Sequence, residues 1–307
     1  MMEHKLKIIY MGTPEFAVPG LRVLAENGFN IVAVVTAPDK PAGRGLKITT
    51  SPVKDFAVEN KIPVLQPAKL KDENFISALK SYDADLQIVV AFRMLPEIVW
   101  SMPRSGTINL HASLLPDYRG AAPINHVIIN GEKETGVTTF FLKHAIDTGD
   151  IIFQEKIPIQ QYDDAGTLHD KLMDAGAELI LKTVGAIESG NYTPIPQLQQ
   201  SEKIAPKIFK NDCQINWNSS AEEVHNFIRG LSPYPGAFTF INDKPVKILR
   251  SAIEQDAFSD TPGKFATDNK TYLTFSTAFG CIQVKEIQAE GKRRMLIEEY
   301  LRGNRIN

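Results

Sequence analysis

Apolar residues in the first half of the chain fall into short runs separated by stretches with helical spacing. Runs rich in β-branched residues at 6–12, 30–38, 85–92 and 107–112 predict strands. Between the first two runs, Phe16, Leu21 and Leu24 are spaced to share one face of a helix. Apolar strands that alternate with helices predict an α/β domain with a mostly parallel sheet covered on both faces. Ligands of such a sheet bind beyond the carboxyl ends of its strands.

A longer helix is predicted over residues 167–190, where Leu168, Leu172 and Leu179 recur at helical spacing and Gly190 is a suitable C-cap. The following residues contain three prolines and little periodicity, which is typical of an extended linker. We therefore expect three parts: a first domain over 1–189, a linker over 190–207 and a second domain over 208–307.

The pattern changes after residue 208. Ser220 and Glu223 have the spacing of a capping box, which predicts the start of a helix over 220–231. Shorter strands are then predicted between turn residues, at 237–242, 244–253, 271–277 and 281–288. Several short strands in so small a region predict a small β-barrel of OB type.

Composition narrows the class of protein only slightly. The chain has 307 residues, 43% hydrophobic and 23% charged, an ordinary balance for a globular protein. No apolar run is long enough to span a membrane, and the first residues lack the apolar core of a signal peptide. The two cysteines have no metal-site or redox-motif spacing. These features favour a cytoplasmic protein, with a monomer as the default.

Charge is distributed unevenly within a net charge of −2. Residues 207–307 carry 14 Lys and Arg against 12 Asp and Glu, whereas residues 1–206 carry 20 against 24. A mildly basic second part is compatible with contact to nucleic acid, although solvated surface charge explains it equally well.

The strand at 107–112 carries two polar residues capable of chemistry. Asn109 and His111 are two positions apart, so in a strand they point to the same face. At the end of a parallel strand they would stand at the ligand crevice, where an amide can donate to an oxyanion and an imidazole can donate or transfer a proton. This combination suits acyl transfer. The alternative is that Asn109 caps a turn and His111 is a buried histidine with ordinary partners.

A carboxylate is expected to orient the imidazole and to favour its charged form. Asp147 and Asp150 both flank a Thr-Gly turn, and residue spacing does not decide between them. Other chemistries lack their motifs, because no G-x-G-x-x-G follows the first strand and no Walker A, H-E-x-x-H or G-x-S-x-G sequence occurs. No metal-ligand spacing is evident, so no metal is expected in the chemistry.

Residues 37–54 form a long segment rich in Pro, Gly, Ser and Thr, with basic residues at Lys40, Arg44, Lys47 and Lys54. Loops of this length inside a compact domain are usually functional or disordered. A flexible basic loop would suit a phosphate backbone, and a solvated excursion is the alternative.

Taken together, the motifs identify a family. NLHASLLPDYRGAAPI and ETGVTTFFLKHAIDTGDII resemble the folate-dependent formyltransferases, and more narrowly those that formylate methionyl-tRNA. MGTPEFAVP, PDKPAGRG, IRGLSPYPGAFT and the closing GKRRM extend the similarity over nearly the whole chain, in the same order and spacing.

The resemblance implies a Rossmann-like formyl-transfer domain and a C-terminal OB-like domain that binds tRNA. It also implies 10-formyltetrahydrofolate as the formyl donor and initiator methionyl-tRNA as the acceptor. The family's catalytic residues match Asn109, His111 and Asp147. The family's folate-proximal segment matches Ser113, Leu114, Leu115 and Pro116. Its acceptor-stem loop matches residues 38–50, with Arg44, Lys40 and Lys47 as the tRNA-binding candidates.

Two positions depart from the family pattern. Phe92 and Arg93 stand where many relatives have Tyr-Gly, in a segment expected near the folate ring, and Asn125–His126 replace a frequent Gln-Trp pair. Three other functions remain open: a formyltransferase acting on a nucleotide-linked amino sugar, a formyltetrahydrofolate hydrolase, and a non-catalytic tRNA-binding protein.

Overall fold

The computed structural model describes residues 5–42, 47–197, 201–255, 259 and 261–306. These residues form two compact units whose pieces alternate along the chain. Unit 1 comprises residues 1–119, 136–157 and 170–203, and unit 2 comprises 120–135, 158–169 and 204–307. Among the described residues, no helix combines the length and apolar composition needed to cross a bilayer.

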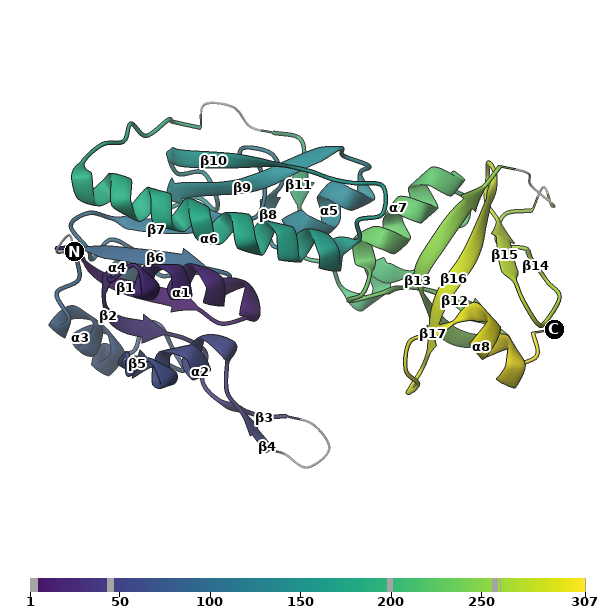
Figure 1. Ribbon diagram of the computed structural model, residues 1–307, viewed down its shortest axis with the longest axis horizontal. Helices are drawn as coiled ribbons and strands as arrows, with labels where there is room; N and C mark the ends of the chain where they lie inside the picture. Colours follow the sequence, from purple (N-terminus) through teal and green to yellow (C-terminus); the bar gives the residue numbers. More distant parts are fainter. Residues whose placement is uncertain (1–4, 43–46, 198–200, 256–258, 260, 307) are drawn as a thin grey trace. The chain divides into compact units, whose positions relative to one another are not determined.

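Unit 1 is built on a twisted sheet (Figure 1). Within the described residues, seven strands are ordered β10-β9-β7-β6-β1-β2-β5. Their bounds are β1 (Lys7–Gly12), β2 (Asn30–Val35), β5 (Val64–Leu65), β6 (Leu86–Val90), β7 (Thr107–His111), β9 (Glu134–Phe141) and β10 (Ile151–Pro158). The pairs β1–β2, β1–β6, β2–β5 and β6–β7 are parallel, whereas β9 runs antiparallel to β7. The expectation of a mostly parallel α/β sheet is therefore confirmed.

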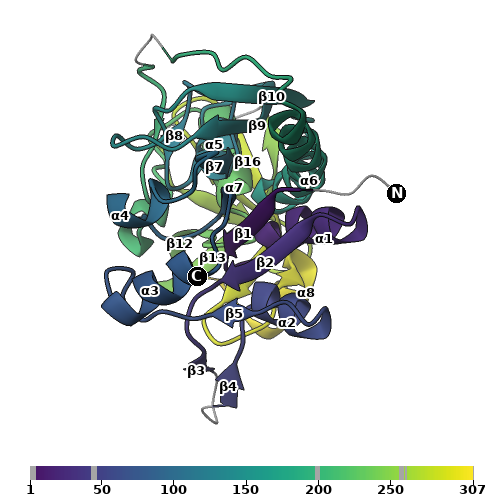
Figure 2. The ribbon, with the colours of Figure 1, turned by 90° about the vertical axis from the view of Figure 1, so that its left-hand side faces the viewer.

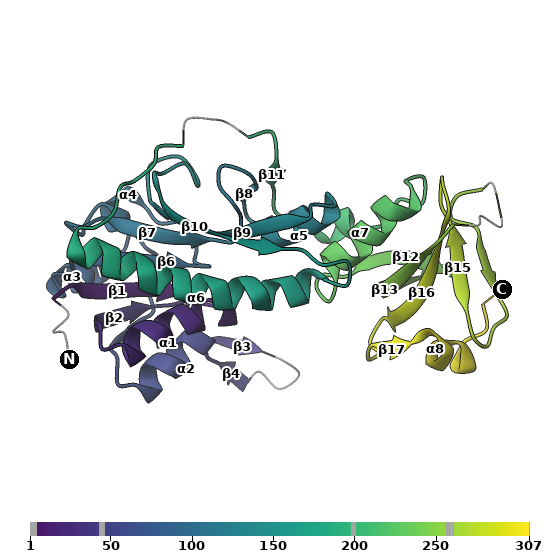
Figure 3. The same ribbon diagram turned by 45° about the horizontal axis from the view of Figure 1, so that its top comes forward.

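Helices cover both faces of this sheet, with α1, α2 and α6 on one side and α3 and α4 on the other (Figure 2). The bounds are η1 (Glu15–Ala17), α1 (Val18–Glu26), α2 (Pro52–Glu59), α3 (Glu73–Ser81), α4 (Glu97–Trp100) and α6 (Ala165–Ser189). Figure 3 shows α6 lying along the sheet. It approaches closely because Gly176 leaves room for Leu110 of β7 and because the hydroxyls of Thr139 and Thr183 bond at 2.8 Å.

The other face has its own apolar core. Ile9 and Met11 of β1 are fully buried there, in one cluster with Phe75 and Leu79 of α3 and Val99 of α4. Burial of such side chains contributes about 1.5–3 kcal/mol each relative to exposure. This core includes residues of β1 and β6, and β6 in turn pairs with β7, which carries the candidate site.

The long segment 37–54 is not entirely a loop. It contains β3 (Lys40–Ala42) and β4 (Lys47–Thr49), which pair as an antiparallel hairpin. Residues 43–46 lie outside the described part of the chain. At the base of the hairpin, the Lys54 ammonium pairs with the Asp39 carboxylate and Gln66 donates to the same carboxylate at 2.8 Å. These contacts hold the base of the hairpin in place.

Unit 2 contains a curled antiparallel sheet ordered β12-β13-β16-β15-β14, with β17 beside β16. Its elements are α5 (Pro123–Ile129), η2 (Lys210–Cys213), α7 (Ala221–Leu231), β12 (Ala237–Ile241), β13 (Lys244–Glu254), β14 (Phe265–Thr267), β15 (Leu273–Ser276), β16 (Cys281–Ala289), β17 (Met295–Leu296) and α8 (Ile297–Gly303). The sheet curls around Phe275, which stacks on Trp217 at 4.4 Å between ring centroids. This half-barrel is OB-like, as predicted.

Helix α7 begins as the sequence predicts. The Ser220 hydroxyl accepts from the Glu223 N–H, and the Glu223 carboxylate accepts from the Ser220 N–H at 2.7 Å. Its far end is joined to earlier parts of the chain, because Asn125 of α5 donates to the Gly230 carbonyl at 2.8 Å. The buried Arg229 donates to the Asp163 carbonyl at 3.0 Å.

A last two-stranded pair joins β8 (Arg119–Gly120) to β11 (Ile204–Ala205). Together with an isolated bridge between Ile151 and Ile195, it shows that the residues expected to form an extended linker pair with other parts of the chain at both ends.

Candidate functional site

Strand β7 brings the two polar candidates to the carboxyl end of the sheet. Leu110 faces α6, while the Thr107 hydroxyl on the opposite face donates to the Trp100 carbonyl of α4 at 2.6 Å. Because side chains alternate along a strand, Asn109 and His111 lie on the same face as Thr107. Asn109 is half-buried, and among the described residues its carboxamide forms no hydrogen bond. It is therefore available to a bound group.

The imidazole of His111 is buried and held in one orientation. Its Nε2 lies 2.9 Å from the backbone carbonyl oxygen of Tyr118. A carbonyl oxygen can only accept, so Nε2 carries a hydrogen and donates it. The other ring nitrogen, Nδ1, faces the Asp147 carboxylate at 3.8 Å, which is longer than a direct hydrogen bond. Nδ1 is thus the ring nitrogen that can serve a substrate.

The structure decides which carboxylate faces the imidazole. Asp150 pairs with the ammonium of Lys143 at 2.7 Å, whereas Asp147 has an Oδ2 3.8 Å from His111. Asp147 has a φ of 53°, in the left-handed region that Asp tolerates better than most residues. Gly149 follows, where an added Cβ would lie 1.5 Å from the Phe141 carbonyl oxygen. The turn is therefore tightly packed.

The segment from Ser113 to Pro116 is held by internal hydrogen bonds. The Ser113 hydroxyl donates to the Asp117 carbonyl at 2.6 Å, and Thr138 donates to the Ser113 carbonyl at 2.6 Å. The Leu115–Pro116 peptide is cis. Ser113 and Leu115 are buried, while Leu114 and Pro116 are partly exposed. The Ser113 side chain is therefore used within the protein, and the two partly exposed side chains are those available for contact.

Arg93, the departure from the family pattern, has a clear set of contacts. Its guanidinium donates to the carbonyl of Ala68 at 2.9 Å and to that of Pro67. These bonds join the segment after β6 to the segment before α3. The side chain itself is exposed at the surface. Arg93 thus supports the conformation of its own segment.

The basic candidates of segment 37–54 are only partly described. Lys40 is exposed on β3, and Lys47 lies on β4. Arg44 lies outside the described residues. Hydrogen bonds from Lys54 and then from Gln66 hold the pKa of Asp39 below its usual range, so the charge of Lys54 is compensated.

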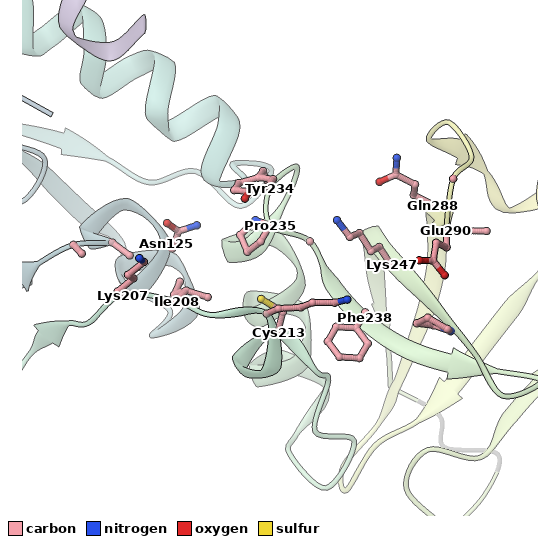
Figure 4. Close-up of a pocket in the computed structure, with 17 residues that line it drawn as sticks. Asn125, Lys207, Ile208, Cys213, Tyr234, Pro235, Phe238, Lys247, Gln288 and Glu290 are labelled. Carbon is pink, nitrogen blue, oxygen red and sulfur yellow. The ribbon is translucent and has the colours of Figure 1, made fainter. Parts of the chain in front are cut away.

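Unit 2 has a pocket of about 640 Å³ that residue spacing did not predict (Figure 4). Three lysines line it, Lys207, Lys210 and Lys247, against one carboxylate, Glu290. The exposed ring of Tyr234 stands at the same pocket. Lysine ammonium groups beside an aromatic ring can contact both the phosphates and the bases of a nucleic acid. Lys207 and Lys210 lie three residues apart, whereas Lys247 comes from β13, and the spacing of the three matches no sequence motif.

The sequence patterns did not predict two further groups that hold the candidate site in place. The Tyr118 carbonyl orients His111, and Gln197 donates to the carbonyls of Asp147 and Gly149 at 3.2 and 2.7 Å. A backbone acceptor leaves no trace in the side-chain sequence. Gln197 lies in the segment expected to be a linker, where a single Gln carries no signal.

Comparison with known proteins agrees with these observations. The formyl transferase family matches residues 4–184, and the formyl transferase C-terminal domain family matches residues 207–305. The chain is 53% identical to methionyl-tRNA formyltransferase of Bacteroides fragilis over 99% of this chain and 96% of that protein. It is 45% identical to the methionyl-tRNA formyltransferase of Alkaliphilus oremlandii over 98% and 97% of the two chains.

A solved structure confirms the similarity of fold. The crystal structure of WlaRD, a sugar 3N-formyl transferase in the presence of dTDP and 5-N-formyl-THF, superposes with a TM-score of 0.68 at 23% identity. The match covers 95% of this chain and 100% of that one. With two matching domain families and full-length relatives at about half identity, the chain belongs to the methionyl-tRNA formyltransferase family.

Proposed function

We propose that the protein transfers the formyl group of 10-formyltetrahydrofolate to the free α-amino group of methionyl-initiator tRNA. The observation that carries the proposal is the available carboxamide of Asn109 beside the His111–Asp147 pair, at the carboxyl end of β7. Family membership names the reaction, and this geometry supports its assignment to these three residues.

In this proposal Asn109 stabilises the oxygen of the formyl group. Attack by the amine places negative charge on that oxygen, and a donor held in place beforehand stabilises the charge without reorganisation. Loss of one such donor typically raises the barrier by about 3–4 kcal/mol. Asn109 suits the role because its carboxamide has no hydrogen-bond partner to give up among the described residues.

His111 transfers the proton in this reaction, and Asp147 stabilises the charge that forms on His111. Formyl transfer releases one proton from the attacking amine and returns one to the departing folate nitrogen. His111 has its Nε2 hydrogen committed to Tyr118, so Nδ1 is the atom assigned to this transfer. Asp147, 3.8 Å from Nδ1, stabilises the imidazolium that forms when Nδ1 takes a proton.

The folate donor is assigned to the segment from Ser113 to Pro116. Leu114 and Pro116 offer partly exposed apolar surface, and Ser113 and Leu115 hold the segment in shape from inside. A pterin ring needs an apolar wall with a few fixed polar groups, which this segment can supply. No metal is assigned a role in the chemistry.

The tRNA is assigned to basic residues of both units. Lys40, Arg44 and Lys47 belong to the segment that the family uses near the acceptor stem, and the lysine-lined pocket of unit 2 offers a second contact. We also propose that the protein is a cytoplasmic monomer with functional domains over 1–189 and 208–307, joined by 190–207.

The test is formyl transfer from 10-formyltetrahydrofolate to charged initiator tRNA by the purified protein. Asn109→Ala and His111→Ala should each lower kcat by about 10²–10³-fold, while binding of methionyl-tRNA stays within a few-fold of the parent. Full activity in either variant removes that residue from the mechanism. Transfer to a nucleotide-linked amino sugar but not to tRNA would replace the proposed acceptor.

A further inference from the structure

The segment that connects the two family regions lies against both loops that carry the candidate catalytic groups. We call residues 190–197 and 201–205 the strap. Near its start, Ile195 and Ile151 exchange two backbone hydrogen bonds of 2.8 Å each. Ile151 is the first residue of β10, directly after the turn that holds Asp147. The strap is therefore paired with the main sheet beside that turn.

Gln197 bonds to the same turn through the nitrogen of its carboxamide. Its Nε2 donates to the Gly149 carbonyl at 2.7 Å and to the Asp147 carbonyl at 3.2 Å. Its Oε1 accepts from Nη2 of Arg119 at 2.6 Å. Because the amide N and O are both bonded, the orientation of the amide group is determined by its partners.

The later part of the strap reaches the loop that orients the imidazole. The Tyr118 N–H donates to the Lys203 carbonyl at 2.7 Å, and the Tyr118 carbonyl accepts from Nε2 of His111 at 2.9 Å. Ser201 donates to the Asp117 carboxylate at 2.5 Å. One connecting segment thus contacts the backbone on both sides of the His111–Asp147 pair.

The turn at Asp147 needs such support. A non-glycine residue with a φ of 53° occupies a sparsely populated region, which costs on the order of 1 kcal/mol unless its surroundings hold it. Asp147 must also keep its Oδ2 directed at Nδ1 across 3.8 Å, without a direct hydrogen bond to maintain the distance. The two donors from Gln197 hold the backbone of the turn on both sides of Thr148.

We propose that Gln197 is a positioning residue for formyl transfer, which acts by fixing the Asp147 turn against His111. This inference rests on the proposed function of the same site. It assigns Gln197 no contact with substrate. Its effect should therefore fall on kcat, because the binding surfaces for folate and tRNA remain in place.

The experiment compares Gln197→Ala, Gln197→Met and Gln197→Glu in the full-length protein. The Met variant keeps the volume of the side chain and removes its strong hydrogen bonds, so it carries the test if the Ala variant does not fold. The Glu variant keeps an acceptor for Arg119 but places a carboxylate against two carbonyls. Gln161→Ala, an exposed glutamine, is the matched control.

We expect kcat to fall at least 10-fold in the three variants, with KM for both substrates within about 3-fold of the parent. The control should match the parent. A kcat within 2-fold of the parent in the Met and Glu variants, or a loss confined to KM for tRNA, would overturn the proposal.

A double-mutant comparison separates positioning from a general structural role. In an Asp147→Asn background, Gln197→Met should lower the single-turnover rate by less than 2-fold, because the group it positions is already absent. The same fold-loss in both backgrounds would show that Gln197 acts independently of Asp147. An inactive parent enzyme would instead contradict the proposed function, so the two failures are distinguishable.

Discussion

At the scale of single residues, the catalytic candidates divide into those that a local rule predicts and those that only folding can select. The alternation of side chains in a strand is local, so the placement of Asn109 and His111 on one face follows from their spacing alone. Asp147 and Asp150 flank one turn. Lys143 forms an ion pair with Asp150, which leaves Asp147 as the carboxylate that faces His111. That contact has no signature in the spacing of the two carboxylates.

A buried carboxylate at the start of β6 gives a prediction at this scale. Asp85 accepts from the Lys7 N–H at 2.8 Å and pairs with Arg104. Burial raises the pKa of Asp85, but these hydrogen bonds and the Arg104 charge outweigh it and leave the pKa below its usual range. The ionised form is therefore stabilised by folding, and its contribution is lost as the pH falls through the lowered pKa.

Asp85→Asn should lower the free energy of unfolding by about 1.5–3 kcal/mol near neutral pH, because charged hydrogen bonds are lost. The difference from the parent should shrink as the pH falls below about 4, where the unfolded carboxylate takes up its proton. Urea titrations over this range measure both effects. Asp83→Asn, at a site with an 82% exposed side chain, should change little. A difference that stays constant with pH would contradict the assignment.

At the scale of elements, strong periodicity predicts well and irregular segments do not. The helix predicted over 167–190 is α6 (Ala165–Ser189), and the helix predicted over 220–231 is α7 (Ala221–Leu231). Strand β9 was not predicted, because its threonines interrupt the apolar pattern. Thr138 donates to the Ser113 carbonyl, and the Thr139 hydroxyl bonds to that of Thr183, so these two polar residues are tolerated in a buried strand. The buried Thr135 hydroxyl, in contrast, has no hydrogen-bond partner among the described residues.

The strap and the hairpin β3–β4 escaped prediction for a related reason. Both form pairs of two or three residues, too short to create a periodic pattern. The strap pairs with Ile151 of β10 and with β8, whereas β3 and β4 pair only with each other among the described residues. Proline-rich composition predicts extended backbone but not what that backbone contacts.

The capping box of α7 gives a prediction at this scale. Ser220→Ala removes the hydroxyl that accepts from the Glu223 N–H, which typically costs about 1 kcal/mol. The melting temperature of the transition that includes α7 should fall by about 2–4 °C. Ser219→Ala, which removes a hydroxyl one residue earlier, is the control for differential scanning calorimetry. An equal fall in both variants would show that the cap contributes nothing specific.

At the scale of the whole molecule, the fold class and the family follow from the sequence, because the motifs extend over most of the chain. The interleaving of the two compact units does not follow, since α5 and residues 158–169 carry no sign that they belong with the C-terminal half. Nor does a net charge of −2 reveal where cations gather. Folding is needed to bring Lys247 of β13 to the same pocket as Lys207 and Lys210.

Binding of a polyanion predicts a specific dependence on salt. The KM for tRNA should rise with salt concentration, because each phosphate contact releases counterions, while the KM for folate should change little. Arg44→Ala and Lys247→Ala should each reduce the slope of log KM against log salt by about one. Steady-state kinetics over a salt series provide the measurement. Lys80→Ala, at an exposed lysine of α3, should leave the slope unchanged.

The shared packing of α5, α7 and the half-barrel limits how this protein can be recombined with its relatives. A chimera joined near residue 207 would take α7 and the barrel from one parent, and α5 and residues 158–169 from the other. The hydrogen bonds Asn125–Gly230 and Asp163–Arg229 would then join residues from different parents. A foreign α7 without an arginine at position 229 would then leave the Asp163 carbonyl without its guanidinium donor. Successful exchange therefore requires that residues 120–135 and 158–169 come from the same parent as the C-terminal half.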